Sequence, residues 1–348
     1  MRVPRGPPKD CSTSSLPKIG VKASYGEYFS RVRMQSEAVT AIHRSLAALP
    51  KGRWLLAVSG GRDSMVLLDA MASARGHEIA GVATFNHGTG AVATRAARLV
   101  ERTAMGLELP VVSGAMPRLA KDAAPTEASW RAARWHFLNG WAEEMRATVV
   151  TAHTRDDQVE TVVLRLLRGA GPRGLAGMLA EPSRVVRPLI EVPREQVGDY
   201  AVARKVRFVE DPSNRSMAHQ RNRVRHELLP ALERAQPGFG AWCWSLSLRA
   251  AQWRRELSGF VDASIRPTVV DGALVVPLAA VRDLTVDGWG TLWPELAARM
   301  GVTMDWRGIA RASEWAPTAK PGSQIPLSGG ALIARTAKTF VLRNAPTQ

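Results

Sequence analysis

The chain has 348 residues, of which 45% are hydrophobic and 22% charged, so it can form a folded core and exceeds the length that one compact core usually holds. Lys and Arg number 47 against 31 Asp and Glu, and the net charge of +16 favours a nucleic-acid partner, although solubility or a bias toward Arg codons would also explain it. The chain has only two cysteines, Cys11 and Cys243, far apart in the sequence, which excludes a disulfide framework and a paired-cysteine metal site. It has no apolar run long enough to span a membrane. We therefore expect a cytoplasmic, non-secreted protein.

Residues 1–35 are rich in Pro, Gly, Ser and basic side chains and show neither a helical nor a strand period. We expect a disordered basic extension there and assign it no function. An RNA-binding arm, an inert tail and a start codon placed ahead of a true start at Met34 all remain open.

Residues 36–214 alternate short apolar runs with longer amphipathic stretches. The apolar runs are Trp54–Val58, Ile79–Phe85, Leu109–Val112 and Thr148–Thr151, and helical patterns follow from Asp63, Ala91, Thr126 and Asp156. This alternation predicts an α/β domain with a parallel sheet and helices on both faces. In such domains the ligand lies beyond the carboxyl ends of the strands.

The first strand is followed directly by Ser59-Gly60-Gly61-Arg62-Asp63-Ser64. Two glycines allow a tight turn, and the helix that begins here directs free N–H groups and its positive dipole end at the same point. The string therefore predicts a phosphate-binding loop, with serine hydroxyls as further donors and Asp63 placed to hold Mg²⁺ or a cationic substrate. A plain strand-to-helix turn is the alternative for the glycines alone.

A second polar cluster follows the strand that ends at Thr151. His153 precedes a helical pattern in which Asp157 and Glu160, three residues apart, share one face. The two carboxylates could recognise the ammonium groups of a free amino acid or hold a metal. Acids are also favoured at any helix start, and a capping role accounts for Asp156.

The composition of the chain changes near residue 215 and again near residue 263. Residues 215–262 are rich in arginine and predict a basic helical connector. In residues 263–348, short β-prone pieces flank a helical stretch that contains tryptophan, which predicts a small α+β domain. The β-prone pieces are Leu274–Val276, Ala331–Ala334 and Thr339–Leu342.

These motifs carry a family resemblance. SGGRDS resembles the SGGxDS loop of the PP-loop ATP pyrophosphatases, and residues 152–178, with AHTRDDQVET, LRGAG and GLAGM, closely resemble the tRNA(Ile)-lysidine synthetase family. Four further stretches agree in order, so that the resemblance covers residues 54–230. They are FNHG at 85–88, Glu127-Ala128 with Arg131 and Arg134, RPL at 187–189 with Arg194, and DPSN at 211–214 with RNRVRH at 221–226. Thr89-Gly90 and Trp135 depart from the family pattern, and the first change removes one possible phosphate-binding arginine.

The resemblance implies a PP-loop domain, Rossmann-like and of the adenine nucleotide alpha hydrolase type, over residues 36–214. It implies a ligase that forms a C–N bond, joining free L-lysine to C2 of the wobble cytidine of a tRNA(Ile) with a CAU anticodon. ATP and Mg²⁺ would be required, the cytidine would be adenylated on the way, and pyrophosphate and AMP would be released. The domain at 263–348 resembles the shorter versions of the family and is expected to bind the tRNA.

Three sets of site residues follow from the resemblance. The set expected to bind ATP is Ser59, Gly60, Gly61, Arg62, Asp63, Ser64, Asn86 and His87, with Asp63 as the Mg²⁺ ligand. The set expected to be catalytic is Asp63, Arg134, His153, Asp157 and Glu160. The set expected to contact tRNA or phosphate is Arg131, Arg187, Arg194, Arg221, Arg223 and Arg225.

Other functions remain as alternatives. A tRNA 2-thiolation enzyme shares the loop and the partner but commonly uses paired cysteines, and an amidotransferase-type PP-loop synthetase would need an ammonia source. A non-enzymatic RNA-binding protein would have no use for both SGGRDS and DDQVET. The sequence leaves open which carboxylate binds metal and which binds lysine, how the tRNA is selected, and whether the chain forms a homodimer.

Overall fold

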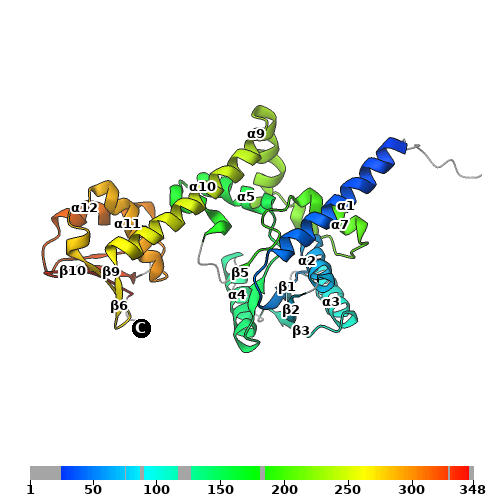
Figure 1. Ribbon diagram of the computed structural model, residues 1–348, viewed down its shortest axis with the longest axis horizontal. Helices are drawn as coiled ribbons and strands as arrows, with labels where there is room; N and C mark the ends of the chain where they lie inside the picture. The colour runs from blue at the N-terminus through cyan, green and yellow to red at the C-terminus, as the bar shows by residue number, and fades with distance from the viewer. Residues whose placement is uncertain are drawn as a thin grey trace, which may run out of the picture.

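The computed structural model of the chain describes residues 25–74, 76–86, 90–116, 127–180, 185–327 and 330–344. The first part is built on a five-stranded sheet in the order β3-β2-β1-β4-β5, in which all neighbouring strands are parallel (Figure 1). Its strands are β1 (Arg53–Ala57), β2 (Glu78–Asn86), β3 (Val111–Ala115), β4 (Thr148–Val150) and β5 (Val185–Val186). The predicted parallel α/β sheet is confirmed.

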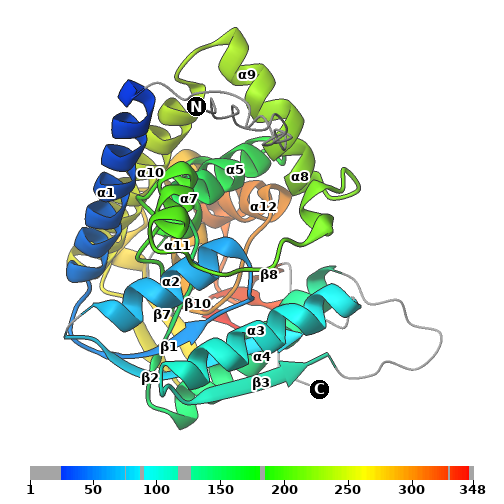
Figure 2. The same ribbon diagram turned by 90° about the vertical axis from the view of Figure 1, so that its right-hand side faces the viewer.

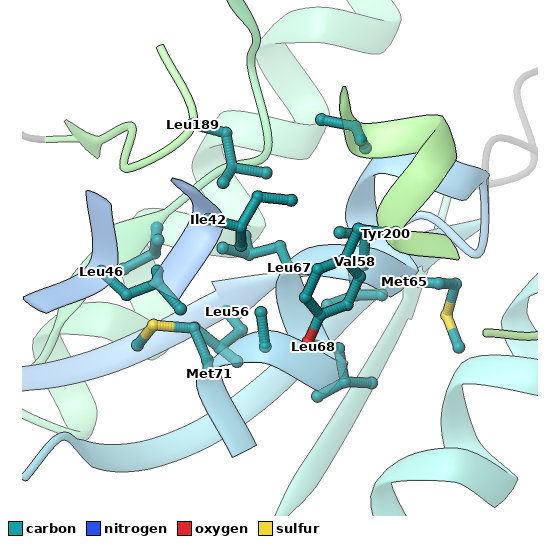
Figure 3. Packing of buried hydrophobic residues seen from close by; sticks show 14 of the residues in the cluster. Ile42, Leu46, Leu56, Val58, Met65, Leu67, Leu68, Met71, Leu189 and Tyr200 are labelled. Atoms are coloured by element: carbon teal, nitrogen blue, oxygen red, sulfur yellow. The ribbon is translucent and has the colours of Figure 1, made fainter. Parts of the chain in front are cut away.

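Helices cover both faces of this sheet because side chains alternate along each strand. In β1, Leu56 packs into a core shared with the helices α1, α2 and α7, whereas Leu55 faces the opposite core with Leu138 of α4. Figure 3 shows the first of these cores, with Ile42 and Leu46 of α1 against Leu56. The helices are α1 (Tyr25–Ala47), α2 (Arg62–Ser73), α3 (Ala91–Gly106), α4 (Glu127–Glu144), α5 (Arg155–Leu166), α6 (Pro172–Leu175) and α7 (Arg194–Ala203).

The predicted extension at residues 1–35 is wrong for residues 25–35, which form the first turns of α1. The second half of α1 buries Ile42 and Leu46, and Arg33 pairs with Glu37 one turn later at 2.8 Å. A helix anchored at one end extends readily, because each added residue contributes a hydrogen bond without a new nucleation step. The apolar period is confined to the anchored half, so the preceding turns leave no signal in the sequence. Residues 1–24 lie outside the described residues.

A helical segment follows the first sheet. It comprises α8 (Gln220–Arg223), a π-helical turn (Val224–Leu228), α9 (Leu229–Ala235) and the long α10 (Phe239–Phe260). Cys243 and Ala250 of α10 pack against Val162 and Val163 of α5, whereas Leu257 near its end packs against the second core. Figure 1 shows α10 running from the first sheet's helices to the second sheet.

The C-terminal part has an antiparallel sheet in the order β6-β7-β10-β9-β8. Its elements are β6 (Thr268–Val270), β7 (Ala273–Pro277), α11 (Val286–Arg299), α12 (Trp306–Trp315), β8 (Gln324–Pro326), β9 (Leu332–Arg335) and β10 (Thr339–Arg343). Its core is aromatic, with Trp289 stacked on Trp293 and Phe340 edge-on to both. The predicted α+β character of this region is confirmed.

Arg173 of α6 and Glu295 of α11 form an ion pair that joins the two parts. Glu295 is buried, and it also pairs with Arg299 of its own helix at 3.3 Å. The contact adds a polar link to the apolar packing along α10. Among the described residues, no helix combines the length and the apolar character needed to cross a bilayer.

Candidate active site

The loop from Ser59 to Ser64 joins β1 to α2 at the carboxyl end of the central strand. The Ser59 N–H donates to Ser64 Oγ at 3.1 Å, and Ser64 Oγ donates to the Gly61 carbonyl at 2.8 Å. Within the described part of the chain, no side chain caps the start of α2 at Gly61. The first N–H groups of α2 are therefore available to an anion, at the end where the helix dipole is positive.

Gly60 lies where three segments meet. Its φ of +82° is the left-handed conformation that glycine adopts without strain, and a Cβ built on it would lie 2.7 Å from the carbonyl oxygen of Ala96 in α3. Its own carbonyl accepts a hydrogen bond from the Val209 N–H at 2.9 Å. The absence of a side chain here lets α3 and the segment after α7 pack directly against the loop.

The start of α5 corrects our interpretation of its two aspartates. The helix begins at Arg155, so Asp157 and not Asp156 occupies the third helical position, where it completes a capping box with Thr154. The Thr154 N–H donates to Asp157 Oδ2 at 2.8 Å. Asp156 instead accepts from the main-chain N–H of Arg194 at 2.7 Å and so holds the start of α7.

Arg194 connects three carboxylates. Its Nη2 donates to Asp157 Oδ1 at 2.8 Å and its Nη1 to Glu160 Oε1 at 2.9 Å, while its Nε lies 3.9 Å from Asp63 Oδ2. These residues come from α7, α5 and α2, which lie together on one side of the sheet (Figure 2). The structure thus brings the phosphate loop and the second polar cluster into one site.

Two further arginines complete this carboxylate cluster, which we define as Asp63, Asp157 and Glu160. Arg221 donates to Glu160 Oε2 at 2.8 Å and to Asp157 Oδ1 at 3.0 Å. Arg225 donates to both oxygens of Glu160, at 2.7 and 2.9 Å. Because residues four apart share a helix face, Arg221 and Arg225 point into the site, whereas Arg223 between them is exposed.

The electrostatics of the cluster follow from burial and from these guanidinium groups. Burial alone would raise the pKa of Asp157, but Arg194, Arg221 and the hydrogen bond from the Thr154 N–H outweigh it and lower this pKa to about 2. The pKa of Glu160 is lowered in the same way, against the effect of burial, by the hydrogen bond from Arg225 and by the three arginines. Both groups are therefore carboxylates at neutral pH.

Asp63 differs from the other two carboxylates. Burial raises its pKa, and the nearby Arg62, which donates to its Oδ1 at 3.1 Å, only partly opposes this. No group of three or more His, Cys, Asp or Glu side chains that could hold a metal ion is found in the described ranges. Asp63 therefore suits an ion of the Mg²⁺ type only if phosphate oxygens supply other ligands, which is how such ions are commonly held.

Arg134 and His153 lie at the same edge. Arg134 of α4 reaches the carboxyl ends of β1 and β2, where it lines a small cavity with Ser59 and Phe85. Burial, and then the charge of Arg131, lowers the pKa of Arg134. His153 Nδ1 is hydrogen-bonded to Thr151 Oγ1 at 2.8 Å, and burial lowers the pKa of His153 to about 4, so its ring is neutral at pH 7.

The remaining predicted residues are more dispersed. Arg131 is exposed on α4, and Arg187 is half-buried and donates to the carbonyl groups of Met178 and Val185. Asn86 ends β2, beside the strand that leads to the loop, and its side chain donates to Thr94 Oγ1 at 3.5 Å. His87 lies outside the described residues.

Two buried amides hold the site's loops, and neither is among the site residues predicted from the sequence. Gln158 is fully buried, donates to the Ala176 carbonyl at 2.9 Å and accepts from the Met178 N–H at 2.8 Å. Asn222 donates to the carbonyl groups of Ser213 and Ser216, each at 2.8 Å. The only available signal was their place inside the matched strings DDQ and RNR.

A family model and curated relatives point to the same family for this chain. The family model of the PP-loop domain matches residues 34–232. A curated tRNA(Ile)-lysidine synthase of Salinispora arenicola is 41% identical over 206 residues, covering 56% of this chain and 61% of the relative. One of Geobacter sulfurreducens is 37% identical over 229 residues, covering 64% of this chain and 49% of the relative. The resemblance predicted from the motifs is confirmed, and the chain spans less than two thirds of the length of these relatives.

A solved structure supports the fold. The U34-tRNA thiolase NcsA of Methanococcus maripaludis, solved with its [4Fe-4S] cluster, superposes with a TM-score of 0.54 at 16% identity. The match covers 69% of this chain and 88% of the thiolase. At that identity the likeness concerns the fold alone.

Proposed function

The chain belongs to the PP-loop family, and we propose on that premise that it is an ATP-dependent ligase that joins free L-lysine to the wobble cytidine of a tRNA(Ile) with a CAU anticodon. The curated relatives at 41% and 37% identity bear the name of this activity. The observation that carries the proposal is the junction at Arg194, which sets the carboxylates Asp157 and Glu160 beside the phosphate loop.

ATP binding is the part that the loop supports. The free N–H groups at the start of α2, together with the hydroxyls of Ser59 and Ser64, suit the phosphates, and Asp63 would hold Mg²⁺ jointly with them. Bound there, Mg²⁺ would neutralise charge that develops on the phosphates. Arg134, which lines a small cavity together with Ser59 and is largely buried, is suited to the same task from the other face of the sheet.

The reaction we propose has two displacements. The C2 oxygen of the cytidine attacks the α-phosphorus of ATP and pyrophosphate leaves; an amine of lysine then attacks C2, and AMP leaves with the oxygen. The proton that the amine gives up passes to water, because His153 at the same edge, with its pKa lowered to about 4 by burial, is a weak base. The cytidine must leave its stack to reach the loop, as is usual when proteins recognise unpaired RNA bases.

Lysine recognition would use carboxylates that already hold arginines. Asp157 and Glu160 face Arg194, Arg221 and Arg225, so an ammonium group must exchange with one guanidinium. The Arg221 side chain is 38% exposed, against 20% for Arg194 and 25% for Arg225. We therefore propose that the ammonium group of lysine displaces Arg221. The displaced Arg221 would then be free to contact a phosphate.

A tRNA 2-thiolation enzyme is a weaker candidate. The structural likeness to a thiolase is one of fold alone. Cys243, the only cysteine among the described residues, is buried against α5, and burial raises the pKa of its thiol to about 11. Such a thiol is a poor nucleophile, and the sequence contains only one other cysteine.

The test is incorporation of labelled lysine into the tRNA with ATP and Mg²⁺. We expect incorporation by the wild type, at least about a hundredfold less by Asp157→Asn, and little change in Glu195→Gln, which removes an exposed charge next to Arg194. If ATP is cleaved in the presence of a tRNA but no labelled lysine is incorporated into it, the chain carries out another modification. The domain division at 214 and 262, tRNA binding by residues 263–348 and a homodimer stay predictions.

A further inference from the structure

A groove of about 660 Å³ lies outside the carboxylate cluster, between α3 and the segment that follows α7. Four arginines line it: Arg95, Arg98 and Arg102 from α3, and Arg207 from the segment. All four are exposed. We call this surface the arginine groove.

The three arginines of α3 form one row because they are spaced by three and four residues and share a helix face. From Arg95 to Arg102 the row extends about 10 Å along the helix axis. A nucleic-acid strand presents several phosphates over such a length. The row therefore matches a chain of negative charges better than a single small anion.

The floor between the arginines is apolar. Leu99 of α3, with Val206 and Phe208 of the facing segment, lines the groove and packs against the core beneath the sheet. The polar side chains among the described residues that line the groove are all arginines, and most protein contacts of arginine with nucleic acid are to the phosphate backbone.

Carboxylates do not neutralise this row. Within the described residues, none of the four arginines forms an ion pair. The acids closest in sequence are engaged elsewhere: Glu101 accepts from Ser113 Oγ, and Glu210 pairs with Arg215 at 3.7 Å. The groove thus carries a concentrated positive charge that a polyanion would neutralise.

The arginine groove shares contacts with the phosphate loop. Val209, at one end of the facing segment, donates its N–H to the Gly60 carbonyl, and Ala96 of α3 packs directly on Gly60. Arg95 is one residue from Ala96, so the row of arginines begins beside the loop and runs away from it. A polyanion held by the row would pass next to the site where its nucleotide reacts.

We infer that the arginine groove binds the sugar-phosphate backbone of the substrate RNA next to the nucleotide that enters the active site. The inference rests on the proposed function only in naming tRNA as that RNA. The contacts are to phosphates, so they add affinity without sequence preference. An acidic protein is the competing partner, and the experiment separates the two.

The experiment measures equilibrium binding of tRNA by the full chain, without ATP or lysine, over a series of salt concentrations. We expect Arg98→Gln/Arg102→Gln to bind at least about tenfold more weakly near 0.1 M salt and to reduce the slope of log Kd against log salt by about 1 to 2. The matched control is Arg44→Gln/Arg146→Gln, which removes two exposed charges near the amino ends of β1 and β4. The control should bind nearly as well as the wild type.

The outcomes distinguish the proposal that the arginine groove binds RNA from the proposed reaction. If tRNA binding is weakened equally in both double variants, or if the salt slope is unchanged in Arg98→Gln/Arg102→Gln, the proposal that the arginine groove binds RNA is wrong even if lysine is incorporated. Binding of polyglutamate that requires Arg98 and Arg102, with tRNA binding unchanged, also overturns it in favour of an acidic protein. If tRNA binding depends on the arginine groove but no lysine is incorporated, the proposal about the groove is supported and the proposed reaction is wrong.

Discussion

Arg225 holds Glu160 by two hydrogen bonds, from Nε to Oε1 at 2.7 Å and from Nη2 to Oε2 at 2.9 Å. Paired contacts of a guanidinium with a carboxylate are stronger and more directional than single ones. The Glu160 side chain is only 1% exposed, so the arginines around it replace the water that would otherwise stabilise its charge. Ion pairs therefore hold α8 and the π-helical turn after it against α5.

Loss of the Glu160 charge should destabilise the fold. In Glu160→Gln, Arg194, Arg221 and Arg225 would face one another with Asp157 as their main counter-charge, and we expect the free energy of unfolding to fall by about 3 kcal/mol. Urea unfolding measures this change. The control Glu210→Gln breaks an exposed pair with Arg215 and should cost less than about 1 kcal/mol. Equal losses in the two variants would contradict a buried, charge-dependent junction.

Replacement of Arg221 should change the use of lysine. If its guanidinium competes with the lysine ammonium for Asp157 and Glu160, Arg221→Ala should lower the KM for lysine by about tenfold, or about 1.4 kcal/mol. Steady-state incorporation at saturating tRNA, with lysine varied, measures this. Arg223→Ala is the control, because Arg223 is exposed on the same helix and should leave the lysine KM unchanged. An unaltered or higher KM in Arg221→Ala would rule out the exchange.

A side chain at Gly60 should disturb the phosphate loop. In Gly60→Ala, the Cβ would meet the Ala96 carbonyl at 2.7 Å on a backbone with positive φ, and we expect about 2 kcal/mol of destabilisation with loss of ATP-dependent activity. Thermal unfolding and pyrophosphate release are the measurements. Gly140→Ala, with open space around its Cβ inside α4, should instead stabilise by about 0.5 to 1 kcal/mol. Normal stability and activity of Gly60→Ala would mean that α3 moves away without consequence.

His153 should make the fold sensitive to moderate acid. Burial lowers its pKa to about 4 from the ordinary 6.5, so between these values the unfolded chain binds a proton that the folded chain does not. Its contribution to stability is complete above pH 6.5 and is lost as the pH falls toward 4. Urea unfolding at pH 7, 6, 5 and 4 should show this loss in the wild type and a shallower one in His153→Gln. The exposed His219→Gln serves as the control, and a steep loss that persists in His153→Gln would exclude this histidine as the cause.

The elements that the sequence predicted well share a strong local signal. The apolar runs before Gly60 and before His153 became β1 and β4, and the helix starts expected at Asp63, Ala91, Thr126 and Asp156 lie within one residue of those observed. The strand β5 has two residues and β8 has three, too few for an alternation to be visible. The first turns of α1 were missed because their sequence carries no apolar period, and residues 30–34 are exposed.

The sequence by itself determined the parallel sheet, the phosphate loop and the pairing of Asp157 with Glu160, because periodicity, turn glycines and helix spacing act between near neighbours in the chain. Only the tertiary structure decided which charges meet. Arg194 lies 34 residues from Glu160 and Arg225 lies 65 residues from it, and no local pattern encodes such contacts. The run of Arg221, Arg223 and Arg225 looked uniform in sequence, yet the turn of a helix directs the outer two into the site and the middle one to solvent. The cluster of carboxylates and arginines thus exists only because α2, α5, α7 and α8 pack around one point at the edge of the sheet.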